Sequence, residues 1–107
     1  MEKLNSNFIA ELFKLMLVDL STMKICSTYL NFKLIPKELG GFKVVLKEAL
    51  DQFEKYDKLP SVGSIAQKYN DNLVVQDTIK EIKNAQLVDK EVVIDQLESY
   101  IRDTEFP

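Results

Sequence analysis

The stretch GGFKVVLKEALDQFEKYD, residues 40–57, decides the fold of this chain. Its apolar side chains recur at intervals of three and four residues, which is the spacing of one face of an α-helix. They are Phe42, Val45, Leu46, Ala49, Leu50, Phe53 and Tyr56. Charged residues occupy the positions between them, so one side of the helix is apolar and the other faces water. The pattern predicts a long amphipathic helix that packs against other helices.

Two glycines lie at the start of this segment, and a proline follows it. Pro60 follows soon after the last aromatic residue, where a helix end is common, and Ser61 is a suitable N-cap for a further helix. Gly40 and Gly41 lack the spacing of a phosphate-binding loop, so we interpret them as a flexible lead-in. The inward face of the next helix would be Val62, Ile65, Ala66 and Tyr69.

The first part of the chain also has helical spacing. Residues 8–18, FIAELFKLMLV, carry apolar side chains around a wide arc, which predicts a helix nearly surrounded by others. A second helix is expected to open at Ser21 as its N-cap. It should end before Pro36, because the residue preceding a proline is disfavoured in the α conformation.

The last part of the chain predicts two helices with narrower apolar stripes, joined near residues 86–89. We expect Asp71 or Asn72 to cap the first of them, and the pair to form an antiparallel hairpin. No run of residues alternates with period two. The predicted fold class is therefore all-α, in one domain over residues 1–107: a small globular helical bundle (6–70) followed by a C-terminal antiparallel helical hairpin (71–104) that leads to a linker.

The apolar stripe of this expected hairpin is a candidate self-association interface. It consists of Val75, Ile79, Ile82, Val93, Leu97 and Ile101. If the hairpin projects from the bundle, two helices alone do not bury so much apolar surface, and a partner helix pair would cover the rest. The alternative is that the hairpin folds back on the bundle, in which case these residues belong to the core.

Composition narrows the classes of function. With 107 residues, 46% hydrophobic and 29% charged, the chain is typical of one soluble globular domain. Its apolar runs fall short of the ~20 residues that cross a bilayer, and Met1-Glu2-Lys3 does not lead into a signal-peptide cleavage site, so a cytoplasmic location is expected. Cys26 is the only cysteine and the chain has no histidine to activate it, so we interpret it as a small buried hydrophobic residue.

Residues for catalysis or metal binding are sparse. Without histidine, and with one cysteine, the usual zinc sites are excluded. Asp51 with Glu54, and Asp95 with Glu98, are spaced one helical turn apart, but such pairs are routine on solvated faces and no calcium-loop pattern accompanies them. We therefore expect no catalytic, cofactor or metal site in these residues.

Charge is unevenly distributed along the chain. Residues 1–60 carry nine lysines against eight acidic residues, and residues 61–107 carry five basic against nine acidic residues. The acidic C-terminal part suits a basic protein partner or serves solubility. A modest basic cluster, at Lys33, Lys37, Lys43 and Lys47, is an alternative contact for nucleic acid or an acidic partner, although Glu38 and Glu48 lie among these lysines and favour an ordinary charged surface.

The order of these elements resembles the N-terminal domain of phage and bacterial DnaB-type replicative helicases. The likeness covers about residues 6–105: an aromatic-rich first helix (FIAELFKLML), a loop ending in Pro36, a long helix closing in FEKYDKLPS, and LESYIRDTEF leading to a linker. The most specific part is Tyr-x-Lys-Leu-Pro-Ser, at residues 56–61. The chain departs from the whole enzyme in lacking the Walker A loop of the motor domain.

The resemblance implies a non-catalytic assembly and docking domain that forms a collar over the helicase ring. It implies homo-oligomers through the hairpins, contact with primase or a helicase loader, and only indirect contact with DNA. ATP and Mg²⁺ would belong to the absent motor domain of an ATP-dependent DNA helicase. The competing interpretation is a free-standing helical nucleic-acid adaptor that uses the Lys33–Lys47 surface.

Overall fold

The computed structural model describes residues 6–30, 35–87 and 89–105. Over these residues the regular secondary structure is helical, which confirms the predicted all-α class. The helices are α1 (Ser6–Val18), α2 (Leu20–Tyr29), the 3₁₀ helix η2 (Lys37–Leu39), α3 (Gly40–Tyr56), α4 (Val62–Lys68), α5 (Leu73–Asn84) and α6 (Lys90–Glu105).

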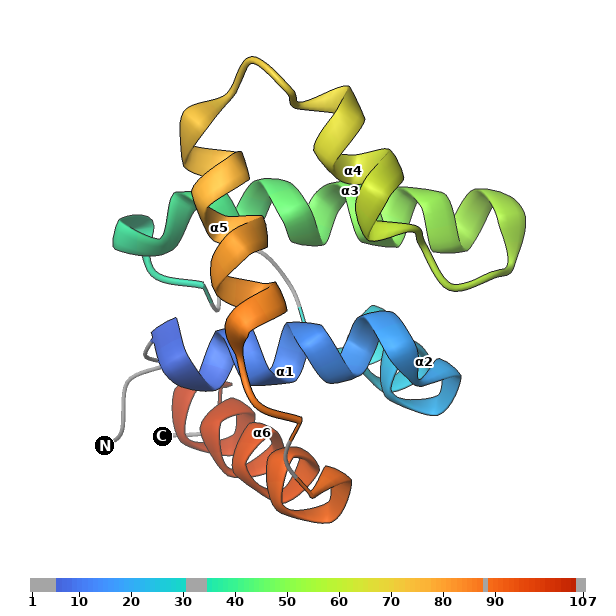
Figure 1. Ribbon diagram of the computed structural model, residues 1–107. Coiled ribbons are helices and arrows are strands. Elements are labelled where there is room, and N and C mark those ends of the chain that lie inside the picture. The colour runs from blue at the N-terminus through green and yellow to red at the C-terminus, as the bar shows by residue number, and fades with distance from the viewer. Residues whose placement is uncertain (1–5, 31–34, 88, 106–107) are drawn as a thin grey trace.

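Helix α1 lies at the centre of the molecule. Figure 1 shows α3 and α4 on one side of it and α6 on the other, while α5 crosses both α3 and α1. Helices α2, α5 and α6 each pack directly against α1. Its buried residues point in most directions around the helix: Ile9, Ala10, Leu12, Phe13, Leu15, Met16 and Leu17. The wide apolar arc of residues 8–18 thus has the predicted consequence, a helix surrounded by others.

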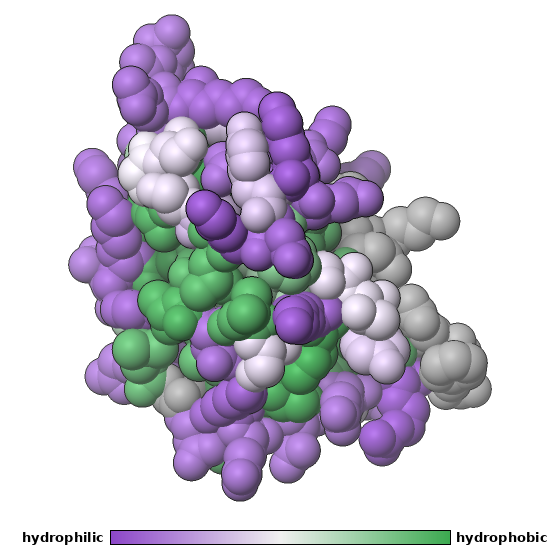
Figure 2. All heavy atoms as spheres, turned by 90° about the vertical axis from the view of Figure 1, so that its right-hand side faces the viewer, coloured by the Kyte–Doolittle hydropathy of each residue, from purple (hydrophilic) through white to green (hydrophobic). Residues whose placement is uncertain are grey.

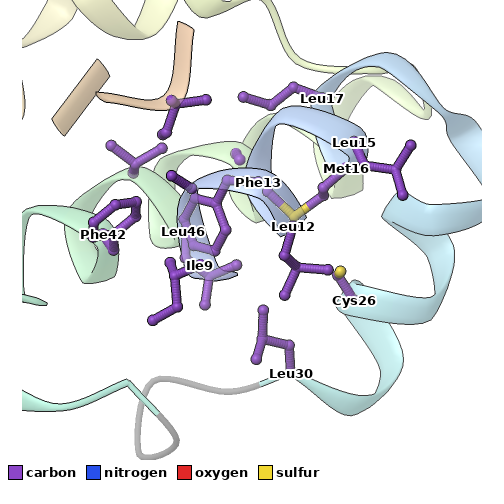
Figure 3. Packing of buried hydrophobic residues seen from close by; sticks show 14 of the residues in the cluster. Ile9, Leu12, Phe13, Leu15, Met16, Leu17, Cys26, Leu30, Phe42 and Leu46 are labelled. Atoms are coloured by element: carbon purple, nitrogen blue, oxygen red, sulfur yellow. The ribbon is translucent and has the colours of Figure 1, made fainter. Parts of the chain in front are cut away.

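The core between α1 and α3 is built around two phenylalanine rings. Phe13 of α1 meets Phe42 of α3 edge to face, with ring centroids 5.3 Å apart and planes at 83°. This geometry suits the ring quadrupoles. Figure 3 shows Leu46 beside these rings and Cys26 near Leu12. Cys26 is fully buried in this core, which confirms its interpretation as a hydrophobic residue.

Close approach of α3 and α5 depends on a glycine at the start of α3. A Cβ atom at Gly41 would lie 2.0 Å from Thr78 Oγ1 and 3.2 Å from Val74 Cγ1. Any larger residue would therefore push the two helices apart. The sequence suggested a flexible lead-in at Gly40 and Gly41, and this prediction is wrong. The two glycines form part of the first turn of α3 itself. Helix packing, rather than chain flexibility, explains the second glycine.

The helix ends follow capping chemistry. The Asp57 residue after α3 adopts the left-handed conformation (φ 52°), and Ser61 and Asn72 accept backbone N–H bonds at the starts of α4 and α5, as predicted. The prediction for α2 is wrong: Asp19, not Ser21, caps it by accepting a bond from the Thr22 N–H. A carboxylate two residues earlier outcompetes the serine because it also accepts from the Ser21 and Thr22 hydroxyls.

Helices α5 and α6, which the sequence predicted as an antiparallel hairpin, pack mainly against other helices and do not project from the bundle. Helix α5 packs against α3, α1 and α4, whereas α6 packs against α1 and α2. In Figure 1, α5 crosses α1 steeply and α6 lies along the opposite side of α1. Of the two outcomes left open by the sequence, the structure has the second: residues 73–105 belong to the same globular unit as the rest.

Two polar contacts hold these helices in place. The Lys14 ammonium donates to the carbonyl oxygens of Lys83 (2.8 Å) and Ala85 (2.6 Å), so a side chain of α1 caps the C-terminus of α5. The carboxylate of Asp19 pairs with Lys90 at 3.0 Å, which joins the start of α2 to the start of α6. Both contacts attach the C-terminal helices to the N-terminal ones.

Candidate functional site

The residues predicted as a self-association interface lie in the core. Val75, Ile79, Ile82, Val93 and Leu97 are buried, and Ile101 is half-buried against them. Of the two alternatives that the sequence left open, the structure has the one in which these residues belong to the core. The physical reason is the breadth of the apolar surface on α1, which accepts α5 on one side and α6 on another, so each helix buries its stripe without a partner molecule.

The lysines of the alternative surface are only partly brought together. Lys33 lies outside the described residues. Lys37 is exposed in η2, and Lys43 and Lys47 follow one another at one-turn spacing on α3, the first partly buried and the second exposed. Glu48, which we expected among these lysines, is buried instead. Its carboxylate turns towards α4, so it does not accompany the lysines on their surface.

The residues around Glu48 form a polar pocket between α3 and α4, with a volume of about 410 Å³. We call it the α3–α4 pocket. Its lining is entirely polar or charged: Glu48, Asp51, Gln52, Lys55, Tyr56, Ser64 and Lys68. The amphipathic pattern of α3 placed Glu48 and Asp51 on the wet side of the helix, but it contained no signal that α4 would fold over that side.

The Glu48 carboxylate is the deepest charged group of this pocket, and its side chain is only 8% exposed. Its Oε1 accepts a hydrogen bond from Lys68 Nζ at 2.7 Å, and its Oε2 accepts from Gln52 Nε2 at 3.2 Å. The hydrogen bond from Lys68 lowers the pKa of Glu48, and this effect outweighs the rise caused by burial. Glu48 is thus a carboxylate at neutral pH, with both oxygens engaged.

The walls of the α3–α4 pocket are side chains with more freedom. The Lys68 side chain is 61% exposed, and Glu48 raises its pKa through their hydrogen bond. Lys55 Nζ lies over the ring of Tyr56, 5.3 Å from its centroid. The pocket therefore has a fixed carboxylate at its bottom, surrounded by lysine side chains that are held mainly by single contacts. Such an arrangement is suited to binding a charged group.

Nucleophilic chemistry has little support from the described side chains. Burial raises the pKa of the Cys26 thiol to about 12, which keeps it protonated. Glu48 and Asp19 are shifted in the other direction, since hydrogen bonds and lysine partners lower the pKa of each carboxyl. Among the described residues, no group of three or more Cys, Asp or Glu side chains is placed to hold a metal ion.

A second surface feature is apolar and lies where α1 turns into α2. Val18 and Leu20 are 59% and 43% exposed on either side of Asp19. We call these two residues the corner patch. Figure 2 looks onto the side of the molecule that includes this corner and the end of α3, and it shows hydrophobic side chains gathered across the middle of that face. Sequence reasoning did not single out these two residues, although the apolar run of residues 8–18 continues past Asp19 at Leu20.

Comparison with known proteins yields no relative: no family model, no curated protein and no solved structure matches this chain. In the part of the chain that the structure describes, no helix is long and apolar enough to cross a membrane.

Proposed function

We propose that the chain is a non-catalytic assembly and protein-docking domain of a DnaB-type replicative DNA helicase. It would act in the cytoplasm, associate with copies of itself, and contact a primase or a helicase loader. The proposal combines the sequence resemblance with the all-α fold. The helicase motor, with ATP and Mg²⁺, would lie in another part of such a protein.

The most specific part of the resemblance, residues 56–61, supports this proposal through its structural role. It forms the corner between α3 and α4, where Asp57 adopts a left-handed conformation, Pro60 is buried and Ser61 caps α4. These features give a tight turn with a defined shape. We expect non-catalytic domains that resemble one another to share motifs with an architectural role, such as this turn.

The observation that carries a docking role is the exposed corner patch. Val18 and Leu20 are uncovered, although the same α1 helix buries seven other residues. Contiguous exposed apolar surface marks protein–protein contacts. A second exposed apolar pair among the described residues, Leu73 and Val74, lies at the start of α5. The corner patch replaces the stripe on α5 and α6 as our candidate for self-association, because the stripe is already covered.

Sedimentation velocity of a corner variant tests the self-association part. We expect Val18→Asp to remain folded and to weaken association about tenfold, since burying a new charge is unfavourable at an apolar contact. Leu73→Asp tests the other exposed apolar pair, at the start of α5, which lies far from the corner in Figure 1. Association weakened as much by Leu73→Asp as by Val18→Asp would remove the corner patch as the specific contact. Equal sedimentation of the parent, both variants and a monomer standard would remove the self-association claim.

The helicase part has an independent test in the gene. We expect the reading frame to continue beyond Pro107 into a Walker A segment within some tens of codons. A stop codon directly after Pro107, with no helicase partner recovered by copurification, would contradict it.

The nucleic-acid adaptor remains a second candidate because of one observation. Glu48 is engaged with Lys68, so it does not neutralise Lys43 and Lys47 on α3. This interpretation predicts DNA binding that weakens steeply with salt and is lost in a Lys43→Glu, Lys47→Glu double variant. No binding to single- or double-stranded DNA at low salt would eliminate it.

A further inference from the structure

We propose that the α3–α4 pocket receives an arginine side chain of a protein partner, with the Glu48 carboxylate as its counter-ion. This inference names the chemistry of a docking partner and goes beyond self-association. It does not depend on the corner patch, on DNA binding or on attachment to a helicase motor.

The sign of the ligand follows from the group at the base of the pocket. The side chain of Glu48 is more than nine-tenths buried, and Asp51, one turn further along α3, also lines the pocket. Both carboxylates act on Lys68, since each raises its pKa. Lys55 and Lys68 balance these charges in the isolated domain, so a cationic ligand reaches the carboxylates by displacing Lys68 from Glu48, whereas an anionic ligand would compete with both carboxylates for the lysines.

In the isolated domain the Lys68 ammonium is the cation bound to Glu48, but it does not use both oxygens of the carboxylate. An ammonium is a compact charge, and here it engages one oxygen, Oε1, which also accepts a long hydrogen bond from the Tyr69 hydroxyl (3.5 Å), while Oε2 is held by the neutral Gln52 amide. A guanidinium has parallel N–H donors that match both oxygens of a carboxylate at once. Since the Lys68 side chain is largely in solvent and ion pairs of exposed lysines are weak, it can move aside.

The aromatic wall of the pocket favours a guanidinium over an ammonium for a second reason. The ring of Tyr56 is exposed and already has the Lys55 ammonium over its face at 5.3 Å. Arginine stacks on aromatic rings more readily than lysine does. An arginine entering from solvent would therefore find a carboxylate at the base and a ring at the side, on an outer surface that a partner protein can reach.

The test is a titration of the ¹⁵N-labelled 107-residue chain, followed by NMR, with N-acetyl-arginine amide as the probe. We expect saturable shifts of the Gln52 and Ser64 resonances at millimolar probe. N-acetyl-lysine amide should bind at least about threefold more weakly, because it offers no paired donors. Inorganic phosphate should leave these resonances unchanged.

Three variants sharpen the result. Glu48→Gln should weaken probe binding about tenfold, since the charge-assisted bond is lost. Lys68→Ala should strengthen it, because the internal competitor is removed. Glu98→Gln, which changes an exposed acid on α6, is the matched control and should bind like the parent.

Several outcomes would overturn the proposal. Phosphate shifting the same resonances would show that the lysines, not Glu48, determine the ligand. Equal binding of the lysine probe would contradict the paired-donor argument, and weaker binding in Lys68→Ala would show that Lys68 is part of the site rather than its placeholder. If Glu48→Gln fails to fold, Lys68→Ala still decides, because a placeholder and a structural residue predict opposite changes in affinity.

Discussion

The apolar stripe on α5 and α6 is covered within the chain, whereas the corner patch between α1 and α2 faces solvent. The stripe belongs to two modestly apolar helices, yet its residues are buried. The corner patch ends the most apolar segment of the chain, yet Val18 and Leu20 face solvent. The difference shows that apolar spacing defines which side of a helix seeks cover, while the positions of neighbouring helices decide whether it finds cover within the chain.

A charge placed in the stripe should have the largest effect on the stability of the fold. We expect Ile79→Asp or Leu97→Asp to destabilise the fold by about 4 kcal/mol or more, because an unpaired carboxylate would be buried. Urea unfolding followed by circular dichroism measures the effect. Val92→Asp, at an exposed position of α6, should change stability by less than about 0.5 kcal/mol. A folded Ile79→Asp protein with altered self-association would restore the stripe as an interface.

A smaller effect is expected where α5 approaches α3. Gly41→Ala should cost about 1–3 kcal/mol, because the new methyl group would overlap Thr78 Oγ1 and displace α5. Gly40→Ala is the matched control at the preceding residue, where a Cβ has nothing within 4 Å. That variant should be stabilised by about 0.5–1 kcal/mol through reduced chain entropy. Thermal unfolding of the two variants side by side provides the measurement, and equal melting temperatures would count against the close α3–α5 contact.

The contact that holds the end of α5 to α1 should contribute less. We expect Lys14→Met to lower stability by about 1–2 kcal/mol, since the carbonyl oxygens of Lys83 and Ala85 lose a charged donor while the apolar stem is retained. Lys80→Met, at an exposed position on α5, serves as control. Hydrogen exchange should accelerate at the C-terminal turn of α5 in the first variant and not in the second.

The smallest expected effect lies within the corner and depends on pH. Hydrogen bonds from Thr22, and then the bond from Lys90, lower the pKa of Asp19 in the folded state. Its contribution is therefore present above the ordinary carboxyl pKa of 3.8 and is lost as the pH falls through the lowered folded value. Asp19→Asn keeps an N-cap but loses the ion pair, so it should cost about 1 kcal/mol or less at neutral pH.

The pH profile separates this contribution from the general acid sensitivity of the fold. The stability difference between the parent and Asp19→Asn should shrink below about pH 4, where the Asp19 carboxyl of the unfolded parent takes up a proton while that of the folded parent stays ionised. A difference that stays constant between neutral and acidic pH would mean that the ion pair with Lys90 does not stabilise the corner.

Local features of the fold were predictable where short-range chemistry controls them. The helical spacing of residues 40–57, the N-caps at Ser61 and Asn72 and the burial of Cys26 all follow from near neighbours in sequence. The cap of α2 was missed because Asp19 and Ser21 compete for the same backbone donors, and only the geometry of the turn selects the carboxylate. Gly41 was misread because its reason, Thr78, lies far along the chain.

The candidate site was less predictable than the fold. The α3–α4 pocket joins Glu48 to Lys68, twenty residues apart, and spacing along α3 says nothing about which helix covers its polar side. Helix periodicity specifies faces, and a face can be paired in several ways with similar gain from burial. Only the complete set of contacts in the folded chain shows which helix face packs against which.

The sequence by itself determined the all-α class of this protein, with amphipathic helices that bury their apolar faces in a core. The tertiary structure alone decided that α5 and α6 bury their apolar stripe on α1, that Val18 and Leu20 stay exposed, and that Glu48 sits at the base of a pocket. The reason is physical. Backbone and capping preferences act over one or two helical turns, whereas burial is settled by the arrangement of all helices around α1.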